Sequence, residues 1–151
     1  MKTACFGRRY PFCASHRLHT SQLSEEQNRA AYGKCNNPHG HGHNYIVEVV
    51  LRGGVSVETG MVVNMSVIDT AVSGLVLERF DHNNLNLDPL FVNRVPTTEN
   101  LCITIFELLD GAVEGVVLDR VRVEETENNF FEYAGQHSGQ VSVVEFEQLN
   151  D

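Results

Sequence analysis

Three histidines and one cysteine lie within a single short segment, residues 35–45, which reads CNNPHGHGHNY. Imidazole is the commonest protein ligand for zinc, and side chains two positions apart in an extended chain leave on the same face. His41 and His43 could therefore bind one metal ion, with the intervening glycines allowing the backbone to approach it closely. A cysteine so near a metal site suggests chemistry rather than packing. The segment predicts a metal site with a reactive thiol, Cys35, beside it.

Spacing alone does not identify the third protein ligand of such a site. A tetrahedral catalytic zinc needs three protein ligands and one open position. His39 alternates with His41 and His43, but three alternating ligands on one strand wrap a tetrahedron poorly. A remote histidine is geometrically better, and His16, at the end of the first expected strand, is the best-placed candidate. On the residues alone, the choice between His39 and His16 stays open.

Two other features could take part in proton transfer or in holding a substrate. Asp81 directly precedes His82 in an asparagine-rich loop, where a carboxylate can orient an imidazole. Cys35 would be the complementary base, its thiolate favoured by the positive charge of Lys34 and of the nearby histidines. Glu125, at the end of an alternating strand, is either a solvated strand end or a carboxylate that pairs with the guanidine-like edge of a heterocycle.

Composition and charge narrow the classes of partner. The chain has 151 residues, 42% hydrophobic and 21% charged, which is typical of one globular domain. Its formal charge of −9 argues against a nucleic-acid or anionic-membrane surface. Arg8, Arg9, Arg17 and Lys34 could still form a local phosphate site, with a solvated basic face as the equal alternative.

No apolar run approaches the ~20 residues of a membrane span, and no signal peptide is evident. Four cysteines without paired spacing favour a reducing compartment, so we expect a cytoplasmic protein.

The hydrophobic pattern predicts an α+β fold. Short strands are expected at 4–12, 44–52, 61–63, 116–124 and 130–133, and helices at 25–32, after Ser66 and at 101–112. The apolar positions expected in the buried stripes of the two longer helices are Val67, Ala71, Leu75, Leu77, Leu101, Ile105 and Leu108. Helices adjacent in sequence between two hairpins indicate an antiparallel sheet with two helices on one face. The other face then needs a cover, for which a partner subunit is the obvious candidate.

Five separated motifs, in order, resemble the 6-pyruvoyl-tetrahydropterin synthase family of the eukaryotic type. They are FCASHRL from residue 12, GKCNNP with GHGHNY from residue 33, FDH from residue 80, TTEN from residue 97, and VEET from residue 123. The match covers about residues 12–135. It departs from the family at Cys13, where serine is usual, and at Phe80, where leucine is usual.

The resemblance implies a role for each matching residue. The implied site consists of zinc ligands His16, His41 and His43, catalytic residues Cys35, Asp81 and His82, and pterin-binding residues Glu125, Thr97, Thr98 and Glu99. Cys35 would abstract a proton, while Asp81 and His82 would act as a proton relay. His39 becomes a family-variable position. Zn²⁺ is the implied cofactor, and Mg²⁺ can accompany a triphosphate substrate.

The same resemblance implies an activity, a carbon–oxygen lyase of tetrahydrobiopterin biosynthesis. Its substrate would be 7,8-dihydroneopterin triphosphate, from which triphosphate is eliminated to give 6-pyruvoyl-tetrahydropterin. One alternative is a sister enzyme, 6-carboxy-tetrahydropterin synthase of the queuosine pathway, whose members usually lack the Asn-Asn-Pro sequence after the cysteine. Another is a non-catalytic, zinc-stabilised scaffold, which loss of the catalytic residues would have signalled.

The implied architecture is the tunnelling fold, in which oligomerisation closes the sheets into a barrel. Three subunits join their sheets, two trimers stack into a homohexamer, and pockets form between subunits. Residues 1–135 would form the synthase domain. Residues 136–151 are an extension that is either flexible or an added strand, with Val141, Val143 and Phe146 alternating.

Overall fold

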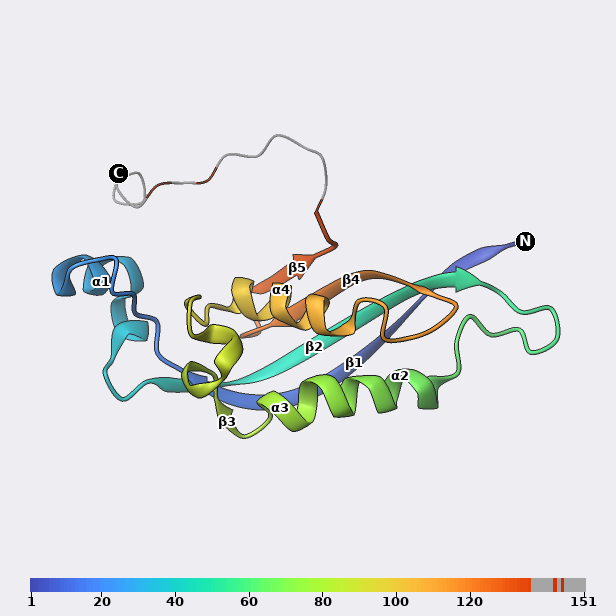
Figure 1. Cartoon of the computed structure of the whole chain (residues 1–151), viewed down its shortest axis with the longest axis horizontal. Coiled ribbons are helices and arrows are strands. Elements are labelled where there is room, and N and C mark those ends of the chain that lie inside the picture. The colour runs from blue at the N-terminus through green and yellow to red at the C-terminus, as the bar shows by residue number, and fades with distance from the viewer. Residues whose placement is uncertain (137–142, 144, 146–151) are drawn as a thin grey trace.

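A five-stranded sheet forms the centre of the computed structural model, which describes residues 1–136, 143 and 145 (Figure 1). Its strands are β1 (Thr3–His16), β2 (His41–Gly54), β3 (Asn83–Asn84), β4 (Val117–Glu124) and β5 (Phe130–Tyr133). Their spatial order is β3-β1-β2-β4-β5. The pairs β1–β2, β2–β4 and β4–β5 are antiparallel, whereas β3 runs parallel to β1. The predicted α+β fold with an antiparallel sheet is confirmed.

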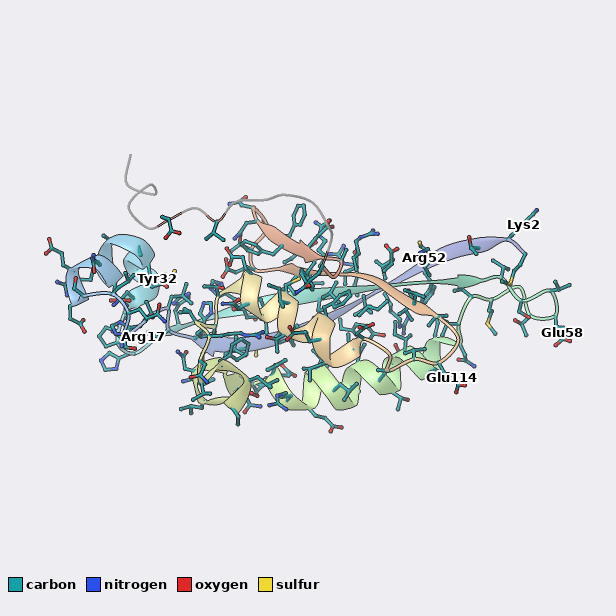
Figure 2. The ribbon with its side chains drawn as sticks, turned by 45° about the horizontal axis from the view of Figure 1, so that its top comes forward. Lys2, Arg17, Tyr32, Arg52, Glu58 and Glu114 are labelled. Atoms are coloured by element: carbon teal, nitrogen blue, oxygen red, sulfur yellow. The ribbon has the colours of Figure 1, made fainter. Side chains whose placement is uncertain are left out.

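Helices cover one face of this sheet, and one further helix lies away from it. They are α1 (Glu25–Tyr32), α2 (Met65–Val72), α3 (Glu78–Phe80) and α4 (Thr98–Leu109). The two longer predicted helices correspond to α2, which continues into α3, and to α4. Both lie on the same side of the sheet (Figure 1). α1 lies instead at one end of the molecule, and Figure 2 shows Arg17 and Tyr32 at that end, with Lys2 and Glu58 at the opposite end.

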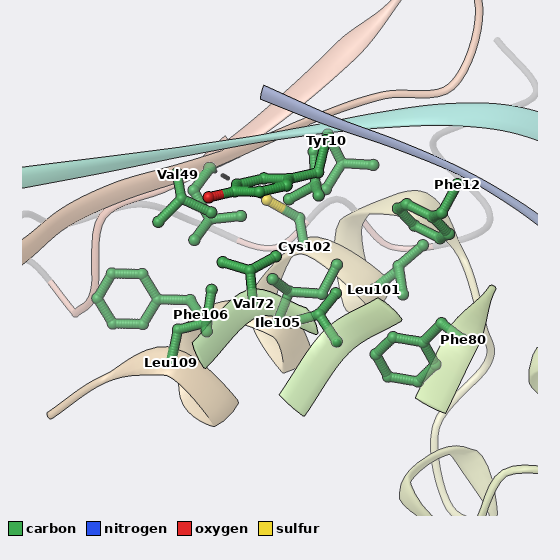
Figure 3. Close-up of a cluster of buried hydrophobic side chains, with 14 of the residues drawn as sticks. Tyr10, Phe12, Val49, Val72, Phe80, Leu101, Cys102, Ile105, Phe106 and Leu109 are labelled. Atoms are coloured by element: carbon green, nitrogen blue, oxygen red, sulfur yellow. Dashed lines mark hydrogen bonds between the residues drawn. The ribbon is translucent and has the colours of Figure 1, made fainter. Parts of the chain in front are cut away.

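The hydrophobic core lies between the sheet and the two helices (Figure 3). Tyr10 and Phe12 of β1 and Val49 of β2 face Leu101 and Ile105 of α4. Because alternate residues of a strand face opposite sides, even-numbered residues of β1 and odd-numbered residues of β2 point to the helices. Each fully buried large apolar side chain stabilises the fold by roughly 1.5–3 kcal/mol. This inner face therefore anchors β1 and β2, the strands that carry the histidines.

The buried stripe of the α2–α3 segment differs from the predicted one. Its fully buried side chains recur every four residues, at Ile68, Val72, Val76 and Phe80. Of the predicted stripe, Val67 is 47% exposed and Leu75 37% exposed, so both assignments were wrong. An α-helix repeats about every 3.6 residues, so a spacing of four drifts around its surface. The π-helical turn Ser73–Leu77 widens the repeat and keeps all four side chains on the sheet side.

Other elements also differ from expectation. β1 and β2 are 14 residues each rather than short strands. The expected strand at 61–63 is instead part of the loop between β2 and α2, so Gly53 and Gly54 end β2 without opening a hairpin. In α4, Leu101 and Ile105 are fully buried as predicted. Among the described residues, none of the helices has the length and hydrophobicity that a membrane span requires. Val141 and Phe146 of the suggested added strand lie outside the described residues.

Charged side chains paired across strands occupy the outer face of the sheet, away from the helices. Arg9 Nη2 donates to Glu124 Oε1 at 2.7 Å. Arg122 Nη2 lies 3.3 Å from the same oxygen, and its guanidinium carbon is 3.6 Å from the ring centroid of Phe130. These pairs place charged groups among the side chains of the outer face, and its cover by a partner subunit stays a prediction.

Candidate active site

Antiparallel pairing of β1 and β2 brings three histidines together. His16 ends β1 and is opposite His41 at the start of β2, while His43 is opposite Ala14. His41 and His43 are two residues apart on one strand, so both face the helix side with His16. The Nε2 atoms of His16 and His41 are 3.1 Å apart, and those of His41 and His43 are 2.9 Å apart. The three ligand atoms lie within 4.8 Å of one another and could hold a metal ion.

Glycines beside the histidines allow this close approach. Gly40 has φ +71°, a left-handed conformation, and a Cβ there would lie 2.9 Å from the carbonyl oxygen of His16. A Cβ at Gly42 would lie 3.3 Å from the carbonyl oxygen of Ala14. Substitution at Gly40 would therefore push apart the strand ends that carry the ligands.

Hydrogen bonding and burial suit the rings to metal binding. The Nδ1 atom of His16 lies 2.7 Å from the carbonyl oxygen of Pro96, so Nδ1 carries the proton and donates, leaving the Nε2 lone pair towards the other rings. His16 is 1% exposed, and burial lowers its pKa, as it does for His43, so the neutral form that a metal requires is favoured. The buried Nδ1 of His41 has no hydrogen-bond partner among the described residues.

The arrangement of the three Nε2 atoms fits a bound cation better than protein hydrogen bonds alone. A neutral imidazole whose Nδ1 donates has only an acceptor at Nε2, so two such nitrogens close together repel. A cation among them would satisfy every lone pair at once. His39 is exposed and does not belong to this group, so the geometry selects His16 rather than His39.

A fixed carboxylate lies beside the histidines. Thr98 Oγ1 donates to Glu125 Oε1 at 2.7 Å, and Asn129 Nδ2 donates to Oε2 at 2.8 Å. His43 Nε2 is 3.5 Å from Oε1. Burial alone raises the pKa of Glu125, but these hydrogen bonds and the neighbouring rings outweigh burial and leave the pKa below its ordinary value. Glu125 is therefore an anion held in one orientation.

Thr97 and Glu99, which flank Thr98, take other positions. Thr97 caps α4, because its Oγ1 accepts from the backbone N of Asn100 at 3.2 Å. Glu99 is exposed, and together with burial its charge raises the pKa of Tyr32. Of these three residues, Thr98 is the one that contacts Glu125.

Cys35 lies in the 3₁₀ turn Gly33–Asn36 and is half-buried. Its carbonyl oxygen accepts from the backbone N of Leu18 at 2.9 Å. Burial, and then the charge of Glu125, raise the pKa of the thiol. The lowering expected from neighbouring positive charge is therefore wrong for the protein groups alone, although a cation at the histidines would oppose this increase.

The Asp81–His82 pair forms a second group, on the other side of β1. Asp81 Oδ1 lies 3.0 Å from His82 Nδ1 and accepts from the backbone N of Cys13 at 2.9 Å. The backbone N of His82 donates to the carbonyl oxygen of Cys13, and His82 has a positive φ of 59°. Cys13 faces away from the helices, and the Cys13 sulfur lies within 4.8 Å of ligand atoms on both partners. A cavity of about 550 Å³ beside this pair is lined by Cys13, His43, Asn44 and His82 among others.

The structure thus brings together some of the predicted site residues and separates others. His16, His41 and His43 gather with Glu125, and the Glu125 charge acts on Cys35. Asp81 and His82 belong instead to the second group, with Cys13. Sequence reasoning missed Asn129 and the carbonyl oxygen of Pro96. A backbone carbonyl carries no side-chain signal, and the one hint for Asn129 was its place four residues after Glu125.

An antiparallel sheet with helices on one face, and three histidines gathered beside an oriented carboxylate, define a metal-binding α+β enzyme. Residues 6–136 match the family described as 6-pyruvoyl tetrahydropterin synthase. The chain is 43% identical over 130 residues to the human 6-pyruvoyl tetrahydrobiopterin synthase, covering 85% of this chain and 90% of that protein. The chain therefore belongs to the 6-pyruvoyl tetrahydropterin synthase family.

Solved structures and a more distant relative agree with this membership. The structure of Caenorhabditis elegans 6-pyruvoyl tetrahydropterin synthase has a TM-score of 0.85 and 40% identity, covering 90% of this chain and 98% of that chain. A putative 6-carboxy-5,6,7,8-tetrahydropterin synthase of Archaeoglobus fulgidus is 40% identical over a shorter stretch of 92 residues, 61% of this chain and 73% of that protein. The similarity to the pyruvoyl enzymes is thus more extensive.

Proposed function

We propose that this chain is a zinc-dependent carbon–oxygen lyase of tetrahydrobiopterin biosynthesis. It converts 7,8-dihydroneopterin triphosphate to 6-pyruvoyl-tetrahydropterin and eliminates triphosphate. Membership of the family supports the reaction. The observation that carries the proposal is the gathering of three histidine nitrogens beside the fixed carboxylate of Glu125.

His16, His41 and His43 would hold the ion through their Nε2 atoms. Zinc is the expected metal because three imidazoles with one open position are typical of catalytic zinc. When bound, it supplies Lewis acidity to the side-chain hydroxyls of the pterin, which makes the adjacent C–H bonds more acidic. Mg²⁺ is the expected companion of the triphosphate because hard cations prefer phosphate oxygens.

Glu125 would anchor the pterin ring. Each of its oxygens accepts one hydrogen bond, from Thr98 or from Asn129, and a carboxylate oxygen has a further lone pair. Those lone pairs match the 2-amino group and the N3–H of a pterin, which would be held in a bidentate pair of hydrogen bonds. Thr97 and Glu99 complete the proposed ring site, Thr97 by fixing the first turn of α4. Anchoring the ring would hold the reacting side chain beside the histidines.

Cys35 and His82 would move the protons. The Cys35 thiolate would take a proton from a side-chain carbon, and His82, oriented by Asp81, would return one to the rearranged product. Two C–H bonds of the side chain would be cleaved in turn. The electron pair of one would pass to the pterin ring, which is reduced as the hydroxyl-bearing carbon is oxidised, and the pair of the other would expel triphosphate. The reaction then needs no external reductant.

A second subunit would supply Asp81 and His82 to each site. Within one chain this pair groups with Cys13 rather than with the three histidines, although His43 and His82 line one cavity. This separation supports pockets formed between subunits of a homohexamer, a dimer of trimers whose sheets join at their edges. The short edge strands β3 and β5 are available for such pairing. The cytoplasm is the expected location, because all four thiols are free.

The decisive experiment follows the products of the purified, zinc-loaded protein incubated with dihydroneopterin triphosphate. We expect triphosphate release together with the mass of a pyruvoyl-pterin. A carboxylated pterin with acetaldehyde would indicate the queuosine-pathway enzyme instead. Bound zinc without triphosphate release would indicate a non-catalytic scaffold. The variants His41→Ala and His39→Ala form a matched pair, in which the first should lose zinc and turnover and the second should keep both.

A further inference from the structure

Most cationic side chains of this chain are already paired with carboxylates. The arginines with a carboxylate oxygen within 4.0 Å are Arg8, Arg9, Arg52, Arg79, Arg94, Arg120 and Arg122. The other two arginines, Arg17 and Arg29, make no such pair among the described residues. Neither do the two lysines, Lys2 and Lys34. These four are therefore the cationic side chains that no carboxylate of the described residues balances directly.

Three of the four unpaired cations line one cavity. Arg17, Arg29 and Lys34 surround a space of about 240 Å³ at the α1 end of the molecule. The acidic residue in the same lining, Glu25, lies 3.9 Å from the ring of His19. Lys2, the fourth cation, is at the opposite end (Figure 2). Like charges gathered in one place cost folding energy, and a multiply charged anion would offset that cost.

Hydrogen bonds hold this end of the molecule in place. Arg17 Nε donates to the carbonyl oxygen of Asn36 at 3.0 Å, and Asn36 Nδ2 donates to the carbonyl oxygen of Leu18 at 2.8 Å. The backbone N of Leu18 donates to the carbonyl oxygen of Cys35. The terminal guanidinium nitrogens of Arg17 have no partner among the described residues. They are therefore donors on a pre-formed support, which lowers the entropy cost of binding.

The cationic cavity adjoins the histidine group. A second cavity, of about 160 Å³, is lined by residues that include His16, Arg17, Pro38 and Gly40. Arg17 and Pro38 line both cavities, so the two spaces are neighbours. A pterin anchored at Glu125 would present its side chain at the histidines, and the group at the end of that side chain would continue towards these cations.

We propose that Arg17, Arg29 and Lys34 bind the triphosphate of the substrate. This inference rests on the proposed function, which supplies the triphosphate. Arg8 and Arg9, the other members of the N-terminal basic cluster in the sequence, are excluded because Asp69 and Glu124 already pair with them. The cavity binds polyphosphate through charge-assisted hydrogen bonds, which are stronger than neutral ones.

Inorganic tripolyphosphate tests the site without turnover. Its binding to the zinc-loaded protein is measured by calorimetry, for the parent, for the double variant Arg29→Gln/Lys34→Gln, and for Lys2→Gln. Arg17 is left unchanged because it supports the Asn36 turn. We expect about tenfold weaker binding for each cavity cation removed and an unchanged affinity for Lys2→Gln, which loses one positive charge at the opposite end. No binding to the parent, or equal binding to the double variant, overturns the proposal.

Steady-state kinetics then identify the source of the polyphosphate. If the cavity receives the substrate, tripolyphosphate competes with dihydroneopterin triphosphate, and the double variant loses kcat/KM by a similar factor. Binding of tripolyphosphate in the expected pattern without competition overturns the substrate assignment, because the cavity then takes a free polyphosphate. The same binding pattern in a protein that never releases triphosphate contradicts the proposed function but leaves the cation site standing.

Discussion

The two faces of the sheet carry different parts of the proposed chemistry. On the inner face, β1, β2 and α4 bring the three histidines and Glu125 into contact within one chain. On the outer face, Asp81 and His82 are held by the backbone of Cys13, and the His82 side chain is 79% exposed. A single chain therefore brings together three histidines that could hold a metal ion. The outer pair is oriented, and of the three histidines His43 lines the same cavity as His82.

Neighbours in sequence are divided between these faces. Arg8 pairs with Asp69 on α2, whereas Arg9 pairs with Glu124 across the outer face. Glu124 and Glu125 also lie on opposite faces, since Glu125 accepts a hydrogen bond from Thr98 on α4, on the helix side of the sheet. Residue type and proximity in sequence therefore do not decide on which face of the sheet a side chain makes its contacts.

The largest expected effect on turnover comes from removing either proposed proton-transfer group, Cys35 or His82. Cys35→Ala and His82→Ala should each lower kcat by about 10²–10⁴-fold, the usual contribution of a positioned acid or base. Zinc content, measured on the purified variants, should stay at the parent level because neither residue belongs to the histidine group. Full activity in either variant would refute its role.

Mixing these two variants tests whether the faces of different chains meet. Oligomers assembled from Cys35→Ala and His82→Ala chains should recover part of the activity, because some sites would combine an intact Cys35 with an intact His82. Each variant assembled alone is the control. Absence of recovery in verified mixed oligomers would mean that both groups act from the same chain.

The next largest effect concerns the packing that supports the inner face. Ile68→Ala should lower the free energy of unfolding by about 2–5 kcal/mol, because it leaves a cavity in the core. Val67→Ala, one residue away but exposed, should change it by no more than about 0.5 kcal/mol. Urea unfolding at constant protein concentration measures both. Equal losses would contradict the buried stripe that the π turn creates.

A smaller effect separates the two adjacent glutamates. Glu125→Gln should lower kcat/KM by about 10–100-fold, since a hydrogen bond to a charged group contributes about 1.5–3 kcal/mol. Glu124→Gln removes the same charge from the outer face, where it should cost at most about 1 kcal/mol of stability and leave kcat/KM unchanged. Similar kinetics for both variants would break the proposed division between the faces.

The smallest effect is a pH dependence of the contact between β1 and α2. Hydrogen bonds from Arg8 and Tyr10 lower the pKa of Asp69 below its ordinary value of 3.8. A carboxyl group with a depressed pKa in the folded state stabilises fully above its unfolded pKa, and this contribution is lost as pH falls through the folded pKa. Asp69→Asn should therefore be less stable than the parent at pH 7, with the difference shrinking as pH falls below 3.8. A constant difference, measured by urea unfolding across this range, would contradict the prediction.

Motif spacing predicted much of the inner site. The alternation of His41 and His43, with glycines between, indicated a shared face and a metal, and the structure gathers both rings. The choice between His16 and His39 needed the strand register, which sets His16 opposite His41. Asn129 and the Pro96 carbonyl were not predictable, because their roles depend on where β5 and the start of α4 come to lie.

The sequence by itself determined the features that depend on neighbours along the chain. The alternation of β1 and β2, the capping box at Ser24 and Gln27, and the ligand chemistry of the histidine segment all follow from residue type and spacing. The tertiary structure decided which cationic side chains have no partner among the described residues, which stripe of α2 is buried, and that Asp81 and His82 group with Cys13. The physical reason is that ion pairing, side-chain burial and side-chain orientation are set by contacts between segments distant in the sequence. Local periodicity does not reveal a π-helical turn or the register between two strands, and both change those contacts.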